Sequence, residues 1–544
     1  MPRWNLVRLA ATAALLLSSS VTAGGSPMRE SPWLGWGGSS LNTRFASTNT
    51  KISSSNIANV RVHCQIPFKG GVSAAATILD GIAYFPAWNG SLVALDYTFC
   101  KIKWQINVTK LVNDFAPSTP IQDALIVPVS RTTPQIDPAN KIIYFGTFRF
   151  AIVVAADLMT GKILAVKRIH THPLAQITQS PSLHGDTLFI GTSSSEESIA
   201  SLPADMSANY TCCSFVGSAV ALRFSRKTAK FTVLWDIPML PADDPNDAGT
   251  WSGVGVWGSA PAIDLKRNQV YYATGNVYSV PDRFLPCTAD PTHPSCALPA
   301  RVWQESVLAL DMNTGRVKWL RQLGPLDSWT VACTIPPINT NLCFGTPGPD
   351  ADFGMAPAFV PSGGKGGKDV LLIGQKNGNL FSLAAETGKV EWATATGPGG
   401  TGGGLSWGVA VDDSQRVYFS LANSQNKPWR PQPKNETEIT GGAHGAASLL
   451  TGKLLWETPT PGVNFTAGSP PTVVSDIVIA ARQNYASGGA LVVLKKATGE
   501  ILLDMPLDAY ALAMVSVFGR YVLFGTGHHA AFDGSFYVLA VPES

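Results

Sequence analysis

The sequence predicts an all-β protein, an eight-bladed propeller of four-stranded antiparallel blades. Composition, length and an internal repeat lead to this prediction. Charged residues make up only 14% of the chain, which also holds 51 glycines and 39 prolines, and this suits strands and turns better than long amphipathic helices. At 544 residues the chain exceeds what one hydrophobic core usually supports, so it is either several domains or an array of repeats.

The repeat decides between these two alternatives. In each copy a strand ends in Ala-Leu-Asp or a similar triplet, Thr-Gly follows, and a tryptophan or its substitute stands four residues after the glycine. Clear copies occupy 309–319, 382–392 and 447–456, degraded copies 94–104, 155–165, 221–235 and 493–503, and a half-copy 521–540. One such sheet cannot bury both of its faces alone, so the copies must stack. Radial stacking leaves only short, protected edges.

Closure of the ring is expected to involve both ends of the chain. Seven copies and one half-copy give eight blades, and the half-copy lacks its last strand. We expect Val60 to Ile66, near the N-terminus, to supply that strand. An open solenoid is the alternative, but a final blade split between the chain ends is a ring-closing device. Three insertions, at 196–215, 279–305 and 324–352, are expected on one face, since sites usually lie on long loops of a rigid scaffold.

The N-terminal residues have the pattern of a secretory signal. Arg3 and Arg8 precede the apolar run Leu9 to Leu17, and Val21-Thr22-Ala23 offers a small-residue cleavage site. We therefore expect a signal peptide over 1–23, a propeller over 24–544, and a secreted protein. A membrane span needs about twenty apolar residues, and this run is too short. With a net charge of +3 and no basic run, nothing indicates a nucleic-acid partner.

Cysteines and glycosylation sequons fit an exported protein. The eight cysteines are an even number, as expected in an oxidising compartment. Cys287 and Cys296 bracket one proline-rich loop, and Cys333 and Cys343 bracket another, so we expect each pair to form a disulfide; Cys64–Cys100 is then left by elimination. Sequons for glycosylation in a eukaryotic host begin at Asn89, Asn107, Asn209, Asn435 and Asn464.

One stretch of the chain combines a strand end with candidate site residues. It reads WGSAPAIDLKRNQVYYATGN, from Trp257 to Asn276, and its apolar strand 270–273 stops at Thr274-Gly275-Asn276. A strand that ends in Gly-Asn places a carboxamide oxygen at the rim of a sheet, where oxygen ligands can converge on a cation. An ordinary Gly-Asn turn is the alternative.

Several segments resemble the quinoprotein alcohol dehydrogenases, and most closely their polyvinyl-alcohol-dehydrogenase-like branch. They are WLGWGGSSLNTRFA (33–46), VSAAATILDGIAYFPAWNGSLVALD (72–96), CCSFVGSAVAL (212–222), ADFGMAP (351–357) and GPGGTGGGLSWG (397–408). The resemblance covers essentially the whole chain after residue 23. It implies an eight-bladed propeller that holds pyrroloquinoline quinone (PQQ) and a calcium ion.

The resemblance assigns metal ligands residue by residue. Residues 191–196 match the Gly-x-Ser-x-x-Glu segment of the family, which implies that Glu196 binds calcium, with neighbouring Glu197 as its substitute. Asn276 matches a second protein ligand. Calcium takes six to eight oxygens, and the cofactor would supply others. Without the resemblance, the two glutamates would be interpreted as part of a solvated loop.

The resemblance also assigns residues that surround the cofactor. Trp257 falls where the family stacks an indole on the quinone, although a tryptophan that packs between blades is the alternative. Lys376 matches a cation directed at the quinone oxygens, and a turn lysine in water is the alternative. Trp407 and Asp352 lie in family-like segments and are expected to line the pocket. Cys212-Cys213 either forms a vicinal disulfide against the cofactor or fastens a loop.

The expected catalytic base departs from the family pattern. The family carries Asp-x-Trp-Asp, whose last aspartate removes the alcohol proton, whereas this chain reads Asp327-Ser328-Trp329-Thr330. Threonine is not a base near neutral pH. Asp327 or Asp352 takes the role, or the chemistry differs. No Cys-x-x-Cys-His occurs, so electrons would leave through a separate acceptor rather than a covalently attached haem.

Two functions follow from these observations. The first is a secreted oxidoreductase that uses PQQ and calcium to oxidise an alcohol, namely a polyol, a secondary alcohol or a natural-product intermediate. The second is a non-catalytic propeller that binds a protein, a glycan or a small molecule on its loop face, and the threonine at position 330 favours it. His528 and His529 are interpreted as turn residues rather than metal ligands.

Overall fold

Apolar runs of five or six residues form the inner strands of this protein, which is described by a computed structural model. The description covers residues 30–207, 210–240, 248–334, 342–434, 437–484, 488–512, 514–529 and 532–543, so the expected signal peptide, Asn209 and Asn435 lie outside it. In β19 (Gln269–Ala273) every residue is buried. In the outermost strand of the same sheet, β22 (Val317–Gln322), none is. Inner strands are therefore covered on both faces by neighbouring sheets.

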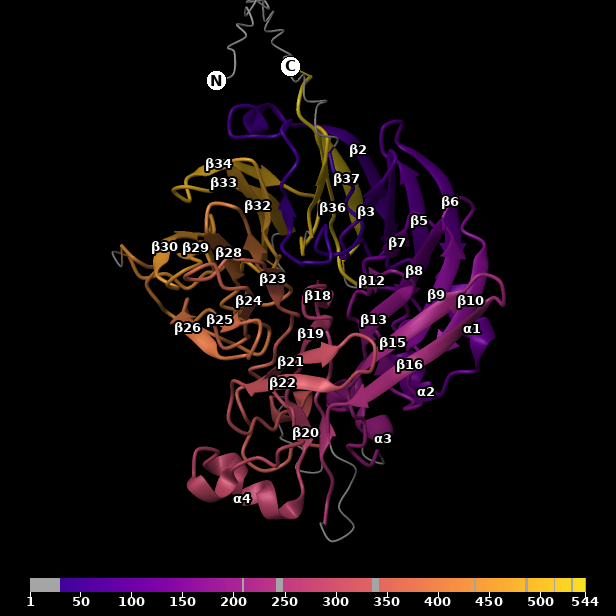
Figure 1. Cartoon of the computed structure of the whole chain (residues 1–544), viewed down its shortest axis with the longest axis vertical. Helices are drawn as coiled ribbons and strands as arrows, with labels where there is room; N and C mark the ends of the chain where they lie inside the picture. Colours follow the sequence, from indigo (N-terminus) through magenta and orange to yellow (C-terminus); the bar gives the residue numbers. More distant parts are fainter. Residues whose placement is uncertain are drawn as a thin grey trace, which may run out of the picture.

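The strands form eight antiparallel sheets arranged as a ring, which confirms the predicted eight-bladed propeller (Figure 1). The first four blades are β3–β6 (Thr77–Leu79, Ile82–Pro86, Ser91–Asp96, Lys101–Asn107), β7–β10 (Gln135–Asp137, Ile142–Gly146, Ile152–Asp157, Ile163–Arg168), β12, β13, β15 and β16 (Ser182–His184, Thr187–Gly191, Ser218–Ser225, Lys230–Pro238), and β18, β19, β21 and β22 (Ala262–Asp264, Gln269–Ala273, Ser306–Asp311, Val317–Gln322).

The last four blades complete the ring. They are β23–β26 (Ala358–Val360, Val370–Gly374, Asn379–Ala384, Val390–Ala395), β27–β30 (Ala410–Val411, Arg416–Leu421, Ala443–Ser448, Leu454–Pro459), β31–β34 (Thr472–Val474, Ile477–Asn484, Gly488–Lys495, Ile501–Pro506), and β35–β37 (Ser516–Phe518, Tyr521–Gly525, Gly534–Ala540) with β2 (Arg61–Phe68). β2 pairs antiparallel with β37, so the N-terminal strand supplies the missing strand of the split blade, as predicted.

The remaining elements are short and lie in the connections. Two small ribbons pair β11 (Ala175–Gln176) with β14 (Ser193–Ser194) and β17 (Ser252–Gly253) with β20 (Val277–Ser279), while β1 (Phe45–Ala46) joins β31. The described helices are α1 (Val108–Phe115), α2 (Pro120–Leu125), α3 (Ala204–Ser207), α4 (Leu285–Ala289) and the short 3₁₀ helices η1 (Ile57–Asn59), η2 (Glu196–Ser201), η3 (Asp282–Phe284), η4 (Pro294–Cys296) and η5 (Val331–Cys333). None of these helices is long and apolar enough to cross a bilayer.

The three insertions emerge on the same face of the ring. Within an antiparallel blade, the connection after the second strand and the connection after the fourth strand leave at the same end. The first two insertions follow second strands, β13 and β19, and the third follows a fourth strand, β22. In Figure 1, α3, β20 and α4 lie near one another at the lower edge of the ring, next to the blades from which these insertions extend. We call the face of the ring at which the connections after second and fourth strands leave the insertion face.

The tryptophan of the repeat packs one blade onto the next. The Trp456 indole N–H donates to the backbone carbonyl of Lys496, 3.2 Å away, in the turn between the outer two strands of the next blade. The same ring covers Gly499, where an added Cβ would lie 2.5 Å from its Cε3 atom. Equivalent pairs are Trp104–Gly161, Trp235–Gly315, Trp319–Gly388 and Trp392–Gly452. Thr-Gly and the tryptophan thus recur because they form one contact between successive blades.

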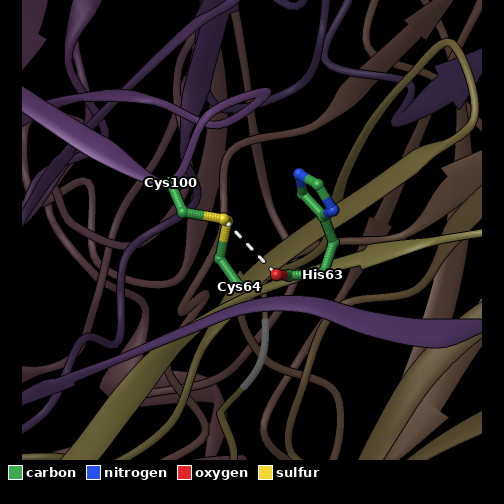
Figure 2. A group of neighbouring side chains, drawn as sticks. All are labelled: His63, Cys64 and Cys100. Carbon is green, nitrogen blue, oxygen red and sulfur yellow. Dashed lines mark hydrogen bonds between the residues drawn. A yellow bond between two sulfur atoms is a disulfide. The ribbon is translucent and has the colours of Figure 1, made fainter.

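A disulfide reinforces ring closure. Cys64, in the N-terminal strand β2, is bonded to Cys100 in the turn between β5 and β6, so the last blade is tied to the first (Figure 2). His63 lies beside this disulfide, and Cys100 Sγ is 3.4 Å from its carbonyl oxygen. Because both sulfurs are in a disulfide, this group offers no thiolate to a metal. The predicted pairs Cys287–Cys296 and Cys333–Cys343 are also formed.

The segment 33–46 runs past the innermost strands of six blades. Trp33 bridges to Ile78, and the carbonyls of Leu34, Ser40, Leu41, Thr43 and Arg44 each accept a backbone N–H from a further blade. The Arg44 guanidinium is fully buried: it donates to the carbonyls of Trp36, Pro471 and Val515. Burial lowers the pKa of Arg44 to about 9. This segment therefore links blades that are far apart in sequence.

Alanine at Gly499 tests the contact between blades. Gly499 and Gly519 both have positive φ, of 74° and 58°, but nothing lies within 4 Å of a Cβ at Gly519. The left-handed backbone alone costs alanine about 1–2 kcal/mol. Gly499→Ala must also displace the Trp456 ring and the Thr458 hydroxyl, which adds about 1–3 kcal/mol. Guanidinium unfolding should show a larger loss for Gly499→Ala than for Gly519→Ala, and equal losses would contradict the docking role of Trp456.

Candidate functional site

A cavity of about 130 Å³ lies among connections on the insertion face. Its lining residues come from segments that follow the second or the fourth strand of a blade: Arg131, Gln176, Thr178, Ser193, Ser194, Glu197, Gly255, Trp257, Asn276, Tyr278, Asp352 and Lys376. Four residues singled out in the sequence, Trp257, Asn276, Asp352 and Lys376, are brought together here from separate segments. We call this space the central cavity.

The carboxamide of Asn276 is oriented by the end of β19. Thr274 closes the strand, because its N–H donates to the Ser306 carbonyl. The Asn276 side chain is buried, and its Nδ2 group donates to the carbonyls of Val277 (2.9 Å) and Trp329 (2.8 Å). With both N–H groups used in this way, the Oδ1 atom is the part of the amide left for a ligand in the central cavity, and a carboxamide oxygen is a calcium ligand.

The two neighbouring glutamates have different environments. Glu196 is bound within its own insertion: it accepts from Tyr210 Oη (2.7 Å) and from the backbone N–H groups of Ser214 and Phe215. Although burial would raise the pKa of Glu196, His172 and these donors hold it below its usual value. Glu196 does not line the central cavity, whereas Glu197 does.

The environment of Glu197 favours the ionised carboxylate less than the environment of Glu196 does. Burial and the nearby Asp352 raise its pKa to about 7, against the opposing effects of Lys376 and Tyr278. A carboxylate that loses its charge this readily lacks a sufficient cationic partner, because like charges and desolvation both disfavour the ionised form. A divalent cation in the central cavity would supply that partner. Glu197, the substitute ligand considered from the sequence, is therefore the glutamate that the structure places beside Asn276.

The vicinal cysteines Cys212 and Cys213 form a disulfide beside Glu196. Cys213 is buried and packs with Phe215, and neither cysteine lines the central cavity. The carboxylate of Glu196 binds the two backbone N–H groups that directly follow the disulfide. In this structure the disulfide and Glu196 together fasten the insertion, which is the loop-fastening alternative.

Trp257, Asp352 and Lys376 form one polar cluster in the cavity. The Trp257 indole N–H donates to Asp352 Oδ2 (3.1 Å), and Lys376 Nζ lies 5.1 Å from the centre of the Trp257 ring. Lys376 also contacts both carboxylate oxygens of Asp350, at 2.9 and 3.0 Å, and Asp352 Oδ2 at 3.5 Å. Burial alone would lower the pKa of Lys376, but the two aspartates raise it. The ammonium therefore stays charged against the indole.

Asp327, the other candidate base, lies outside the central cavity. Its carboxylate accepts from the backbone N–H groups of Asp350 (3.3 Å) and Ala351 (2.7 Å), so it supports the loop that carries Asp352. Burial raises the pKa of Asp327, which is 1% exposed. The hydroxyl of Thr330 donates to the carbonyl of Leu342 and is likewise used within an insertion. Of the two candidate aspartates, Asp352 is the one that a ligand in the cavity can reach.

Arg131 is a cavity residue that sequence analysis did not find. Its guanidinium lies 5.2 to 5.8 Å from the ring centres of Trp88, Phe148 and Trp407, and burial lowers its pKa to about 10. No carboxylate of the described residues forms an ion pair with it. Arg131 stands in the unremarkable stretch Ser-Arg-Thr-Thr, so no motif could have identified it. A half-buried cation that has no ion-pair partner among the described residues is suited to an anionic ligand.

Trp407 packs against Trp257 at the edge of the central cavity. The two indoles meet edge to face, with ring centres 5.6 Å apart. Trp407 is carried by the glycine-rich loop 397–408, which packs against the turn that holds Lys376: a Cβ at Gly404 would lie 2.5 Å from the Lys376 carbonyl oxygen. Glycine is needed there because the two backbones touch. Trp407 thus lies at the edge of the central cavity rather than among its lining residues.

Comparisons with known proteins agree with the resemblance found in the sequence. The family model described as outer membrane protein assembly factor BamB matches residues 303–511. Polyvinylalcohol dehydrogenase from Pseudomonas sp is 26% identical over 399 residues, which are 72% of this chain and 55% of that protein. The enzyme of the same name from Sphingopyxis sp. (strain 113P3) is 27% identical over 401 residues, 72% of this chain and 54% of that protein. The chain therefore spans about half the length of the curated relatives it matches.

Solved structures give the same fold. The quinohemoprotein alcohol dehydrogenase from Comamonas testosteroni aligns with a TM-score of 0.65 and 17% identity, over 94% of this chain and 82% of that chain. A europium-containing methanol dehydrogenase aligns with a TM-score of 0.66 and 16% identity, over 95% and 99%. At these identities the structural likeness establishes the fold alone. Together with the curated relatives, it confirms the resemblance to quinoprotein alcohol dehydrogenases and to their polyvinyl-alcohol-dehydrogenase-like branch.

Removal of the Lys376 charge should destabilise the folded protein and make its stability depend on pH. Lys376→Met leaves Asp350 buried and unpaired, which costs about 3–5 kcal/mol of folding free energy. The burial that raises the pKa of Asp350 then acts unopposed, so the folded state binds more protons than the unfolded state. The free energy of unfolding of this variant should therefore fall as the pH rises from about 5 to about 8.

The control for this prediction is Asp350→Asn/Lys376→Met, which removes both charges. It should regain most of the lost free energy of unfolding and should lack the pH dependence of Lys376→Met. Guanidinium unfolding at several pH values checks both variants. A Lys376→Met protein as stable as wild type at every pH would contradict the ion pair.

Proposed function

We propose that this protein is a quinoprotein-type oxidoreductase that oxidises an alcohol group with PQQ and calcium. The observation that carries the proposal is the convergence of Trp257, Asn276, Asp352 and Lys376, from four separate segments, on one cavity. A scaffold protein has no physical reason to bury an ammonium, two carboxylates and an oriented carboxamide around an indole. The resemblance to enzymes of this class, found over the propeller, supports the same reading.

The residues present fit the cofactor and its metal. PQQ is a flat tricarboxylate, and the central cavity offers the Trp257 indole for its ring and two cationic side chains, Arg131 and Lys376. The oxygens of Glu197 and Asn276 suit calcium, which prefers carboxylate and carbonyl ligands. We assign the metal to these two residues, because Glu196 is already engaged by three donors of its own insertion.

The side chains of the cavity have distinct tasks in alcohol oxidation. Bound PQQ would supply the two-electron acceptor that no protein side chain provides. Asp352 is the group placed to take the proton of the substrate hydroxyl, and the Trp257 and Asn276 N–H groups that it accepts fix the direction of its carboxylate. Lys376 holds a positive charge in the same cavity, where it would be available to the oxygens of the bound quinone.

The cellular setting belongs to the same proposal. The N-terminal pattern of 1–23, four disulfides and the sequons support export to an oxidising compartment. A quinone that has accepted electrons must be reoxidised, so a separate electron acceptor is required. The substrate is an alcohol: a polyol, a secondary alcohol or a hydroxyl of a natural-product intermediate.

Thr330 favours the second candidate function, a propeller that binds a ligand without turning it over. The family pattern has its base at this position, and here the hydroxyl is bound to a backbone carbonyl. In that case the central cavity would hold its ligand and Asp352 would serve only as a hydrogen-bond acceptor. Activity measurements separate the two functions.

Calorimetry with two neighbouring variants tests cofactor binding. PQQ titrated into the chain in the presence of calcium should bind, and Glu197→Gln should weaken the calcium-dependent part by at least about tenfold because a charged ligand is lost. Glu196→Gln, the matched control, changes the adjacent carboxylate and should leave that part much less affected. Greater loss in Glu196→Gln than in Glu197→Gln would overturn the ligand assignment, and absence of binding by folded wild type would overturn the proposed function.

Steady-state oxidation of alcohols with an artificial electron acceptor tests catalysis. Asp352→Asn should lower kcat by about 10²–10⁴-fold, the usual contribution of a general base, while PQQ binding persists. Asp327→Asn should retain most of the activity per folded molecule, since its carboxylate is held by backbone N–H groups and by Glu305 and does not line the central cavity. Wild-type protein that binds PQQ but oxidises no alcohol would favour the non-catalytic function.

A further inference from the structure

A second and larger cavity, of about 560 Å³, opens on the insertion face between the last three blades. Its walls are the connections that follow β26, β28, β30 and β34, together with the last two residues of β32, all of which lie at this face. All of its lining residues are uncharged, in contrast to the central cavity with its carboxylates and cations. Most of them carry hydroxyl or amide groups. We call this space the side cavity.

Three polar atoms in the wall of the side cavity are buried and have no hydrogen-bond partner among the described residues. They are Oε1 of Gln483 and the hydroxyl oxygens of Ser406 and Ser424. Gln483 is only 2% exposed, and its Nε2 group donates to Tyr510 Oη (3.3 Å), which leaves its Oε1 atom free to accept. Buried polar atoms are normally satisfied, so these three have unused capacity to hydrogen-bond a ligand in the side cavity.

The side cavity adjoins the proposed cofactor site through Trp407. This indole lines the side cavity and also the narrow space that contains Arg131, and it meets Trp257 edge to face. A ligand in the side cavity would therefore lie next to the wall of the central cavity. Trp407 and Tyr510 add aromatic surface to a wall otherwise rich in amides and hydroxyls.

We propose that the side cavity binds a neutral carbohydrate. Amide and hydroxyl groups pair with sugar hydroxyls, whereas the lack of charged side chains disfavours acidic or basic ligands, and the polar wall disfavours an apolar one. An aromatic side chain suits the apolar face of a sugar ring. The proposal that a carbohydrate binds in the side cavity rests on the cavity alone. The further step, that this carbohydrate is part of the substrate, rests on the proposed function.

Calorimetry on the cofactor-free full chain tests this inference. The probes are maltohexaose, cellohexaose and chitohexaose, with a hexagalacturonate as the charged probe and a polyvinyl alcohol oligomer as a hydroxyl chain without sugar rings. We expect at least one neutral hexasaccharide to bind with a Kd below about 1 mM, and tighter than both other probes. Failure of all three hexasaccharides to bind, or tighter binding of the charged or the ring-free probe, would overturn the proposal.

Variants identify the cavity as the place of binding. Gln483→Leu and Ser424→Ala should each weaken the hexasaccharide by at least about tenfold, because each removes a hydrogen-bonding group. Ser414→Ala, on the turn at the opposite end of the blade that carries Ser424, is the matched control and should bind as wild type does. Ser424 lies in a surface connection, so its variant remains informative if Gln483→Leu does not fold. Unchanged binding in folded Ser424→Ala and Gln483→Leu would overturn the site.

A parallel titration with PQQ separates this inference from the proposed function. Sugar binding without PQQ binding would support the side cavity and contradict the quinoprotein proposal. PQQ binding without sugar binding would support the quinoprotein proposal and contradict carbohydrate binding in the side cavity.

Discussion

The contact between a tryptophan of one blade and a Thr-Gly turn of the next is the interaction on which the rest of this structure depends. In this contact an indole lies over a glycine, which can adopt a positive φ and has no Cβ to clash with the ring. The indole N–H also donates a hydrogen bond to a backbone carbonyl of the same turn. Repeated between successive blades, it sets how each sheet lies on the next. The central cavity is formed by connections from many blades, so its shape follows from these contacts, from the disulfide-tied closing strand and from the segment 33–46.

The central cavity concentrates charge that the fold must compensate. Lys376 is held by Asp350 and Asp352, and Asp352 in turn accepts from Trp257 and Asn276, so each of these side chains fixes the orientation of another. Glu197 and Arg131 are left incompletely paired at the cavity wall. Such a cavity is pre-organised for a ligand that brings a cation to Glu197 and anionic groups to Arg131. The neutral side cavity has the opposite character, which suits a separate ligand or a separate part of one substrate.

The sequence was informative where a site residue is tied to the repeat, and uninformative where it is not. The eight blades, the closing strand and three disulfides could be predicted from the Thr-Gly–tryptophan spacing and from cysteines that bracket loops. Asn276 could be found because it ends an apolar strand. Glu196 and Glu197 could not be told apart, because adjacent residues of a single 3₁₀ turn point about 120° apart and the sequence does not give that rotation. Arg131 has no local signal, since only the ring brings it beside Trp407.

A crystal structure of the chain reconstituted with PQQ and calcium would test the central claim most directly. We predict density for the flat cofactor against the Trp257 indole, with its carboxylates toward Arg131, and a cation about 2.3–2.6 Å from oxygens of Glu197 and Asn276. A cofactor bound elsewhere on the propeller, or a cation held by Glu196 while Glu197 faces away from it, would contradict the account.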